Sequence, residues 1–213
     1  MILPFSIDQF FGVFEKYNQS IYPMQIIIFA LGFLAIISLH TRSRINDKFI
    51  GTFLGLLWIW NGIVYHIGFF SLINKPAFAF GGLFILQGLM LLINTFINKF
   101  TFRNTKQTKE LVGEFFILFG LIIYPFIAYL MSGSFVRTIS LGLPCPSTIL
   151  TFGFFLFANK GFPKYLLIIP CLWSIVGLSA ALNFGVYQDF MLIVAAITTV
   201  VILLRKNKIV VAN

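Results

Sequence analysis

The chain has 213 residues, of which 59% are hydrophobic and 10% are charged, and its mean hydropathy is +0.98. A soluble domain is about 45–50% apolar and about 25% charged, so this composition excludes a soluble enzyme, a disordered regulator and a secreted disulfide scaffold. Its two cysteines are too few for a disulfide framework. The composition therefore predicts an integral membrane protein that crosses the bilayer several times.

The N-terminal stretch predicts a helix at the membrane surface. It has neither the basic region nor the small-residue cleavage site of a signal peptide. Ser6 and Gln9 have the spacing of a capping box, which starts a helix. Aromatic residues then recur at helical spacing, at Phe10, Phe14 and Tyr17. We expect a short amphipathic helix over 7–17 that lies on the outer membrane face; the alternative is that it only caps the bundle.

Seven apolar stretches follow, and each is a candidate spanning helix, which needs about 20 mostly apolar residues. The segments between them are short and polar or rich in Pro and Gly, so no soluble domain fits between the spans. We predict an all-α fold, with residues 1–213 forming one transmembrane domain, a seven-helix bundle. The spans are expected near 21–40, 49–72, 77–98, 110–131, 144–159, 163–184 and 188–204.

Basic residues give this bundle an orientation, because cytoplasmic loops carry an excess of Lys and Arg. With the N-terminus outside, only Lys16, Lys75 and Arg137 lie outside. The inside then holds twelve basic residues: Arg42, Arg44, Lys48, Lys99, Arg103, Lys106, Lys109, Lys160, Lys164, Arg205, Lys206 and Lys208. This bias accounts for the net charge of +9 without a nucleic-acid partner. We expect a multi-pass protein of the bacterial cytoplasmic (inner) membrane, with a cytoplasmic C-terminus.

The second span carries an unusual polar stripe. Its members share one helix face: Trp58, Asn61, Gly62, Tyr65, His66 and Phe69. Because polar groups in hydrocarbon cost free energy, the stripe should face the bundle. His66 is then either a structural residue that bonds a neighbouring helix or a group that binds a ligand or transfers protons.

The fifth span is too short for the bilayer. An uninterrupted helix from Pro146 to Asn159 would measure about 21 Å, at about 1.5 Å per residue, against a hydrocarbon core of about 30 Å. Pro144 and Pro146 disfavour regular helix before them, and irregular backbone at membrane depth must be buried or line a cavity. Cys145 lies at the start of this helix, whose dipole favours a thiolate. The alternative is a rigid Pro-Cys-Pro plug with an inert thiol.

The predicted topology gathers several chemically capable residues in the outer third of the membrane. They are Asp8, Glu15, Tyr17, Tyr65, His66, Cys145, Asn183 and Asp189. Their side chains suit proton relay or acid–base work. His66, Cys145 and Asp189 are also metal-ligand types, but their spacing matches no metal motif, so they are weak metal candidates and no cofactor is predicted.

Several stretches together resemble a family of bacterial inner-membrane proteins of unknown function. They are LPFSIDQFFGVFEKYN, WIWNGIVYHIGFF, GLPCPSTILTFG and IIPCLWSIVGLSAALNFGVYQD. The resemblance covers nearly the whole chain, and its most specific parts are the GLPCP and Tyr-His stretches. It implies a multi-helix inner-membrane protein and transfers no activity. It draws attention to Tyr65, His66, Pro144, Cys145, Pro146, Thr148 and Asp189.

These observations favour a carrier or channel for a small solute or ion, with an outward-facing polar cavity. The expected cavity-lining residues are Trp58, Asn61, Tyr65, His66, Pro144, Cys145, Thr148, Asn183, Asp189 and Glu15. The first alternative is a membrane-embedded enzyme with Cys145 as nucleophile and His66 as base. The second is an accessory membrane protein without a site. The expected partners are the lipid bilayer and a small solute or ion, and a homo-oligomer is compatible with the sequence.

Overall fold

A computed structural model describes residues 5–41, 44–159 and 161–205 of the chain. The predicted basic residues Arg42, Lys160, Lys206 and Lys208, and the side chain of Arg44, lie outside the described part. The fold is helical. Its α-helices are α1 (Ile7–Ile21), α2 (Met24–Leu39), α3 (Arg44–Trp60), α4 (Ala77–Phe96), α5 (Thr108–Leu118), α6 (Tyr124–Ser132), α7 (Pro144–Leu156), α8 (Ile168–Phe184) and α9 (Phe190–Arg205).

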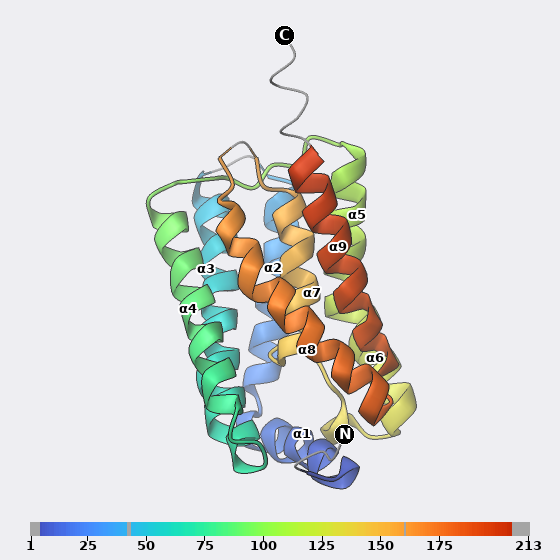
Figure 1. The fold of residues 1–213 in the computed structure, drawn as a ribbon. Helices are drawn as coiled ribbons and strands as arrows, with labels where there is room; N and C mark the ends of the chain where they lie inside the picture. The colour runs from blue at the N-terminus through green and yellow to red at the C-terminus, as the bar shows by residue number, and fades with distance from the viewer. Residues whose placement is uncertain (1–4, 42–43, 160, 206–213) are drawn as a thin grey trace.

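Two π-helical segments and several 3-10 turns extend these helices into longer rods. The π-helix η1 (Asn61–Phe69) and the turn η2 (Phe70–Leu72) continue α3, and the π-helix η3 (Phe119–Ile123) joins α5 to α6. Short 3-10 turns complete the chain: η4 (Phe135–Arg137), η5 (Lys164–Leu167) and η6 (Tyr187–Asp189). The rods run along one long axis, whereas α1 lies across one end and α9 ends at the opposite one (Figure 1).

The predicted N-terminal helix forms, and it continues beyond residue 17 to Ile21. Ser6 Oγ accepts from the Gln9 N–H at 3.1 Å, and Gln9 Oε1 accepts from the Ser6 N–H at 2.8 Å, which completes the predicted capping box. The chain then turns by 86° into α2. This angle lays α1 across the end of the bundle (Figure 1).

The seven expected spans are only partly matched by the helix lengths. Among the described residues, five helical stretches are long and apolar enough to cross a membrane. They are Ile45–Leu72, Ala77–Phe96, Thr108–Ser132, Lys164–Phe184 and Tyr187–Arg205. A sixth is available if the bent pair of α1 and α2 counts as one broken span. The helices at the two other predicted spans, 21–40 and 144–159, are shorter than expected. Helix α2 starts only after Pro23 and has 16 residues, and α7 has 13.

Helix α7 is the central helix of the bundle. Every one of its residues except Cys145 is buried, and it packs against α3, α5, α8 and α9. Thirteen residues measure about 20 Å, whereas the five long stretches contain 19 to 28 residues. The centre of the bundle is therefore filled by a helix over only part of its length, and α7 begins some way short of the end covered by α1 (Figure 1).

Glycines allow α7 and α5 to approach closely. An added Cβ at Gly153 would lie 2.6 Å from the Gly113 carbonyl oxygen, and one at Gly113 would lie 2.8 Å from the Gly153 carbonyl oxygen. The same arrangement joins α3 to α4, where Gly55 and Gly88 face each other. Small residues at helix contacts are typical of membrane bundles, in which close backbone approach supplies the packing energy.

We expect Gly153→Ala to destabilise the protein by about 1–3 kcal/mol, the usual cost of overpacking a well-packed core. The new methyl group would meet backbone atoms of α5, which cannot move independently of that helix. The measurement is SDS-induced unfolding in mixed micelles. Gly82→Ala is the matched control, because an added Cβ at this α4 position meets nothing within 4 Å. Equal stability of the two variants would contradict the close α5–α7 contact.

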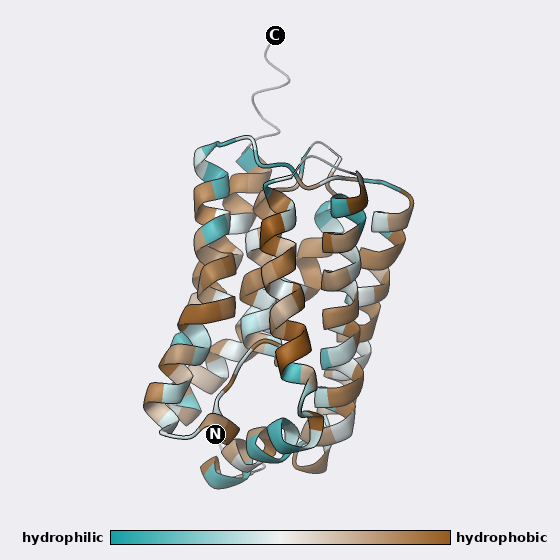
Figure 2. Ribbon diagram, turned by 180° about the vertical axis from the view of Figure 1, so that it is seen from behind, coloured by the Kyte–Doolittle hydropathy of each residue, from teal (hydrophilic) through white to brown (hydrophobic). Residues whose placement is uncertain are grey.

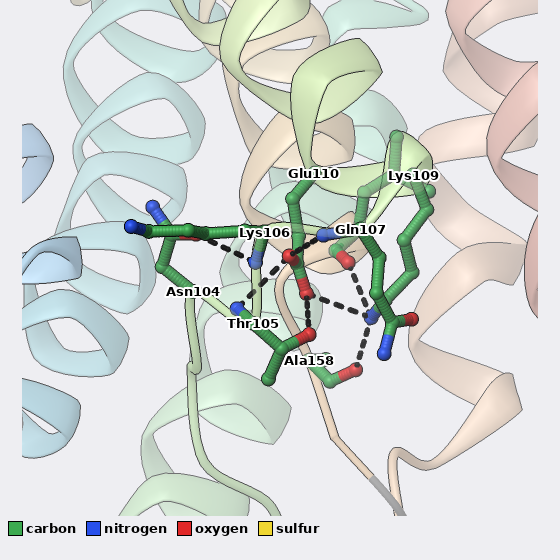
Figure 3. A network of polar contacts seen from close by, with 8 residues as sticks. Asn104, Thr105, Lys106, Gln107, Lys109, Glu110 and Ala158 are labelled. Carbon is green, nitrogen blue, oxygen red and sulfur yellow. Dashed lines mark hydrogen bonds and ion pairs between the residues drawn. The ribbon is translucent and has the colours of Figure 1, made fainter.

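The end of α7 remote from α1 is closed by a buried polar network (Figure 3). Lys109 Nζ donates to the carbonyl oxygens of Leu156 and Ala158, at 2.7 and 3.2 Å. Glu110 accepts from the backbone of Thr105 and Gln107 at 2.9 and 2.7 Å. A lysine at the C-terminus of a helix satisfies carbonyl groups and complements the helix dipole. This network fixes the position of α7 and leaves its other end to form the candidate site.

Candidate functional site

A cavity of about 270 Å³ occupies the space between the start of α7 and helix α1. Nine of its twenty lining residues are aromatic and one, Asp189, is charged. We call it the aromatic chamber. Its aromatic residues are Phe5, Phe10, Phe14, Tyr65, Phe70, Phe80, Tyr124, Trp173 and Phe184. The cavity exists because α7 is short and large rings cannot fill the remaining volume completely.

Helix α1 covers the chamber with the aromatic face that the sequence predicts. Phe10, Phe14 and Tyr17 are buried, whereas Asp8 is exposed. The Phe10 ring stacks on Phe184 with centroids 4.3 Å apart, and the Phe14 ring stacks on Tyr65 at 5.9 Å. The amphipathic helix therefore buries its apolar face against the bundle.

Three polar side chains of α1 fix the helix in this place. Tyr17 donates to the Gly142 carbonyl oxygen at 2.5 Å and accepts from Trp60 Nε1 at 2.7 Å. Asn18 Nδ2 donates to carbonyl oxygens of the segment that leads into α7, those of Val136 and Thr138, at 2.9 Å each. A charged pair, Glu15 with Arg137, joins the same two segments at 2.9 Å. Helix α1 and the irregular segment before α7 thus hold each other in position.

The polar corner of the chamber is built from three separate elements. Asp189, at the end of η6, is 1% exposed. The hydroxyl of Tyr124, the first residue of α6, donates to Asp189 Oδ1 at 2.5 Å. Cys145, at the start of α7, lines the same cavity. These three residues form a polar corner in a largely apolar cavity.

The polar stripe of the second span faces the bundle, as predicted. Trp58, Asn61, Tyr65 and His66 are all buried. From Asn61 onward, however, the helix is a π-helix, which has more residues per turn than an α-helix, and this changes the face that each residue presents. At the end of the stripe Phe70 is consequently buried and Phe69 is only partly buried. Such π-segments are frequent at functional sites.

His66 lies behind the chamber wall rather than in it. Its ring packs between Phe84 and Trp173, with centroids 4.7 and 5.0 Å away, and it does not line the cavity. Neither ring nitrogen has a hydrogen-bond partner among the described residues. The hydrogen bond between Cys145 and His66 that an embedded cysteine enzyme would need is therefore not formed between these two described residues.

The other sequence candidates divide into two groups. Tyr65, Pro144, Cys145 and Asp189 line the chamber. The other five candidates do not line it, which corrects the expectation. Asn61, Thr148 and Asn183 donate to carbonyl oxygens one turn earlier in the chain, those of Leu57, Pro144 and Ser179. Trp58 donates to Thr151 Oγ1, and Glu15 pairs with Arg137 at the surface. Most of these side chains bond within their own helix, because a neighbouring turn offers a carbonyl oxygen at the right distance.

Sequence reasoning missed Tyr124 and Trp173 as chamber residues. Tyr124 precedes Pro125 in the fourth predicted span. The hydroxyl group within an apolar span was the available signal, since buried tyrosine hydroxyls usually have a hydrogen-bond partner. Trp173 gave no signal beyond its size.

A second cavity of about 270 Å³ lies beside α1 at the same end of the molecule. It is lined by the charged residues Asp8 and Arg137 and by Gln188. We call it the vestibule. It shares two lining residues with the aromatic chamber, Ile139 and Phe184. The two cavities are therefore adjacent and separated by these side chains.

The metal hypothesis finds no support in the geometry. Across residues 5–41, 44–159 and 161–205, no three His, Cys, Asp or Glu side chains gather closely enough to hold a metal ion. His66, Cys145 and Asp189 accordingly do not form a ligand set. The polar side chains that line the chamber are one carboxyl group, one thiol, two phenol groups, the Asn74 amide, the Ser179 hydroxyl and the Trp173 indole.

Comparison with known proteins identifies the family of the chain. No curated protein and no solved structure is significantly similar to it. The model of a family of unknown function, DUF6064, matches residues 7–212. The long apolar helices are compatible with an integral membrane protein. The chain thus belongs to the DUF6064 family of unknown function.

Proposed function

We propose that this protein is a membrane carrier that binds a small amphipathic molecule in the aromatic chamber. The observation that carries the proposal is the chamber itself, which combines aromatic walls with one hydrogen-bonded carboxyl corner. Ligand pockets are typically lined by apolar and aromatic side chains with a few placed polar groups. An apolar cavity of about 150 Å³ is enough to bind benzene, so the chamber has room for a larger molecule.

A carrier is favoured over a channel because the chamber ends within the bundle. Beyond the start of α7, the centre is filled by large side chains without solvent exposure, among them Phe152, Phe154 and Phe155. Lys109 and Glu110 occupy the far end of the bundle. A channel needs a continuous polar path, and this packing supports none. The presence of the chamber also argues against the alternative of an accessory protein, which would have a fully packed interior.

The proposal includes seven passes through the bacterial inner membrane, with α1 outside. Helix α7 need not match the bilayer, because other helices surround it and Lys109 bonds the carbonyl groups at its C-terminal end. Described basic residues near the α1 end are Lys16, Lys75 and Arg137, and those toward the other end are Lys48, Lys99, Arg103, Lys106, Lys109, Lys164 and Arg205. The apolar middle and the polar ends of the bundle are visible in Figure 2. This asymmetry favours a cytoplasmic C-terminus.

We expect a C-terminal fusion to alkaline phosphatase to be inactive and a fusion to green fluorescent protein to fluoresce, because the C-terminus is cytoplasmic. The reference fusion ends after Lys75, between η2 and α4, where the proposed topology places the chain outside and the phosphatase should be active. The opposite pattern at the C-terminus would overturn the topology.

Carriage requires the chamber to open in turn to both sides of the membrane. We would place a single cysteine at Ala180, which lines the chamber, in a background of Cys145→Ser and Cys171→Ser. A membrane-impermeant methanethiosulfonate reagent is then applied to oriented proteoliposomes from either side. A carrier is labelled from both sides.

Labelling from the α1 side alone would identify a binding protein without transport and would overturn the carrier. Absence of labelling from either side would overturn an accessible chamber. Lys75→Cys is the matched control, because residue 75 lies between η2 and α4 at the α1 end and should react from that side only.

A further inference from the structure

We propose that the ligand of the aromatic chamber is an organic cation with an apolar body, such as an alkylated or aromatic ammonium ion. This inference rests on the proposed function and specifies its ligand. It is carried by the juxtaposition of one buried carboxyl group, Asp189, with nine aromatic side chains in one cavity.

Asp189 has no cationic partner among the residues that the structure describes. The ion pairs of the described residues join other groups, and no Lys, Arg or His lines the chamber in the part of the chain that the structure describes. A buried carboxylate without a counter-charge costs several kcal/mol. A bound cation would supply the counter-charge that the described residues do not provide.

The carboxyl group is also held ready for a ligand rather than used as a helix cap. Asp189 directly precedes α9, whose N-terminus favours negative charge. Its hydrogen-bond partner is nevertheless the Tyr124 hydroxyl, and both residues line the chamber. The side chain therefore points toward the chamber, and the donated hydrogen bond favours the carboxylate form.

The aromatic walls suit the same class of ligand. The negative face of an aromatic ring attracts a cation, and recognition of ammonium groups by several rings is a recurrent arrangement. Tyr65, Tyr124 and Trp173 line the chamber together with the Asp189 carboxyl group. The other lining residues are mainly phenylalanine and aliphatic side chains, which would contact an apolar body, and Asn74 and Ser179 add two neutral polar groups. An anionic ligand would instead meet the Asp189 charge without a basic residue to offset it.

The test compares phenyltrimethylammonium with tert-butylbenzene, in which carbon replaces the charged nitrogen and the shape is kept. Binding to the purified protein in nanodiscs is measured by ligand-observed NMR, with empty nanodiscs subtracted. We expect the cation to bind at least tenfold more tightly than its neutral isostere. Asp189→Asn should remove this preference and leave the affinity for tert-butylbenzene unchanged.

Tyr124→Phe provides a second variant that keeps the ring and removes only one hydroxyl group. It should weaken cation binding severalfold without changing binding of the neutral probe, and it keeps the proposal testable if Asp189→Asn does not fold. Glu114→Gln is the control, because this carboxyl group pairs with His40 far from the chamber and its loss should change neither affinity.

The outcomes separate the two proposals. If tert-butylbenzene binds as tightly as the cation, the chamber binds small molecules but the cation inference is wrong, and Asp189 acts as a neutral hydrogen-bonding group. If neither probe binds, the proposed function fails as well. A cation preference that survives both Asp189→Asn and Tyr124→Phe would place the recognising charge elsewhere and would also overturn the inference.

Discussion

Replacing Ala180 by phenylalanine is expected to abolish binding of both phenyltrimethylammonium and tert-butylbenzene, with a loss of affinity of at least about a hundredfold, or about 2.7 kcal/mol. Ala180 lines the aromatic chamber from α8 and is partly buried, so a benzyl group at this position would occupy the volume that a ligand needs. The measurement is the same NMR titration in nanodiscs, preceded by a thermal unfolding scan to show that the variant is folded.

The matched control is Leu182→Phe on the same helix. Leu182 is 68% exposed on the outer surface of the bundle, and its replacement adds a similar ring where lipid would contact the protein. This variant should bind both probes like the wild type. If Ala180→Phe also retained normal binding, the probes would be bound elsewhere and the chamber would not be the site.

His66 provides the second large effect, this time on stability. We expect His66→Ala to lower the free energy of unfolding by about 3 kcal/mol, as for other large buried side chains. The ring is fully buried and in contact with Phe84, Trp173 and Phe80, so its removal would leave a cavity directly behind the chamber wall. SDS titration in mixed micelles measures the change.

His66→Phe distinguishes packing from a polar role. Because neither nitrogen has a hydrogen-bond partner among the described residues, a phenyl ring should replace the imidazole within about 1 kcal/mol. It should also leave binding in the chamber unchanged. Loss of binding with normal stability would mean that the imidazole nitrogens take part in function, and the structural assignment of His66 would be wrong.

Several features of this protein follow from the sequence because they depend on local interactions. The capping box of Ser6 and Gln9 and the aromatic face of α1 require only residues within one helix. The same holds for the inward orientation of the stripe from Trp58 to His66, since burial of polar groups away from lipid is a property of one helix face. The composition determines the helical membrane character for a similar reason: hydrophobicity is a sum over residues and needs no contact between distant ones.

Only the tertiary structure decided which residues meet. One alternative drawn from the sequence pairs Cys145 with His66, but in the structure the His66 ring packs against Phe84 and Trp173 behind the chamber wall. Asp189 meets Tyr124 across 65 positions of the chain, a contact that depends on how α6 and α9 pack around α7. The chamber itself results from a length difference, because α7 is shorter than the helices around it and α1 covers the space that remains. Helix pattern is local and can be predicted from one segment, whereas a cavity is the volume that several packed segments fail to fill.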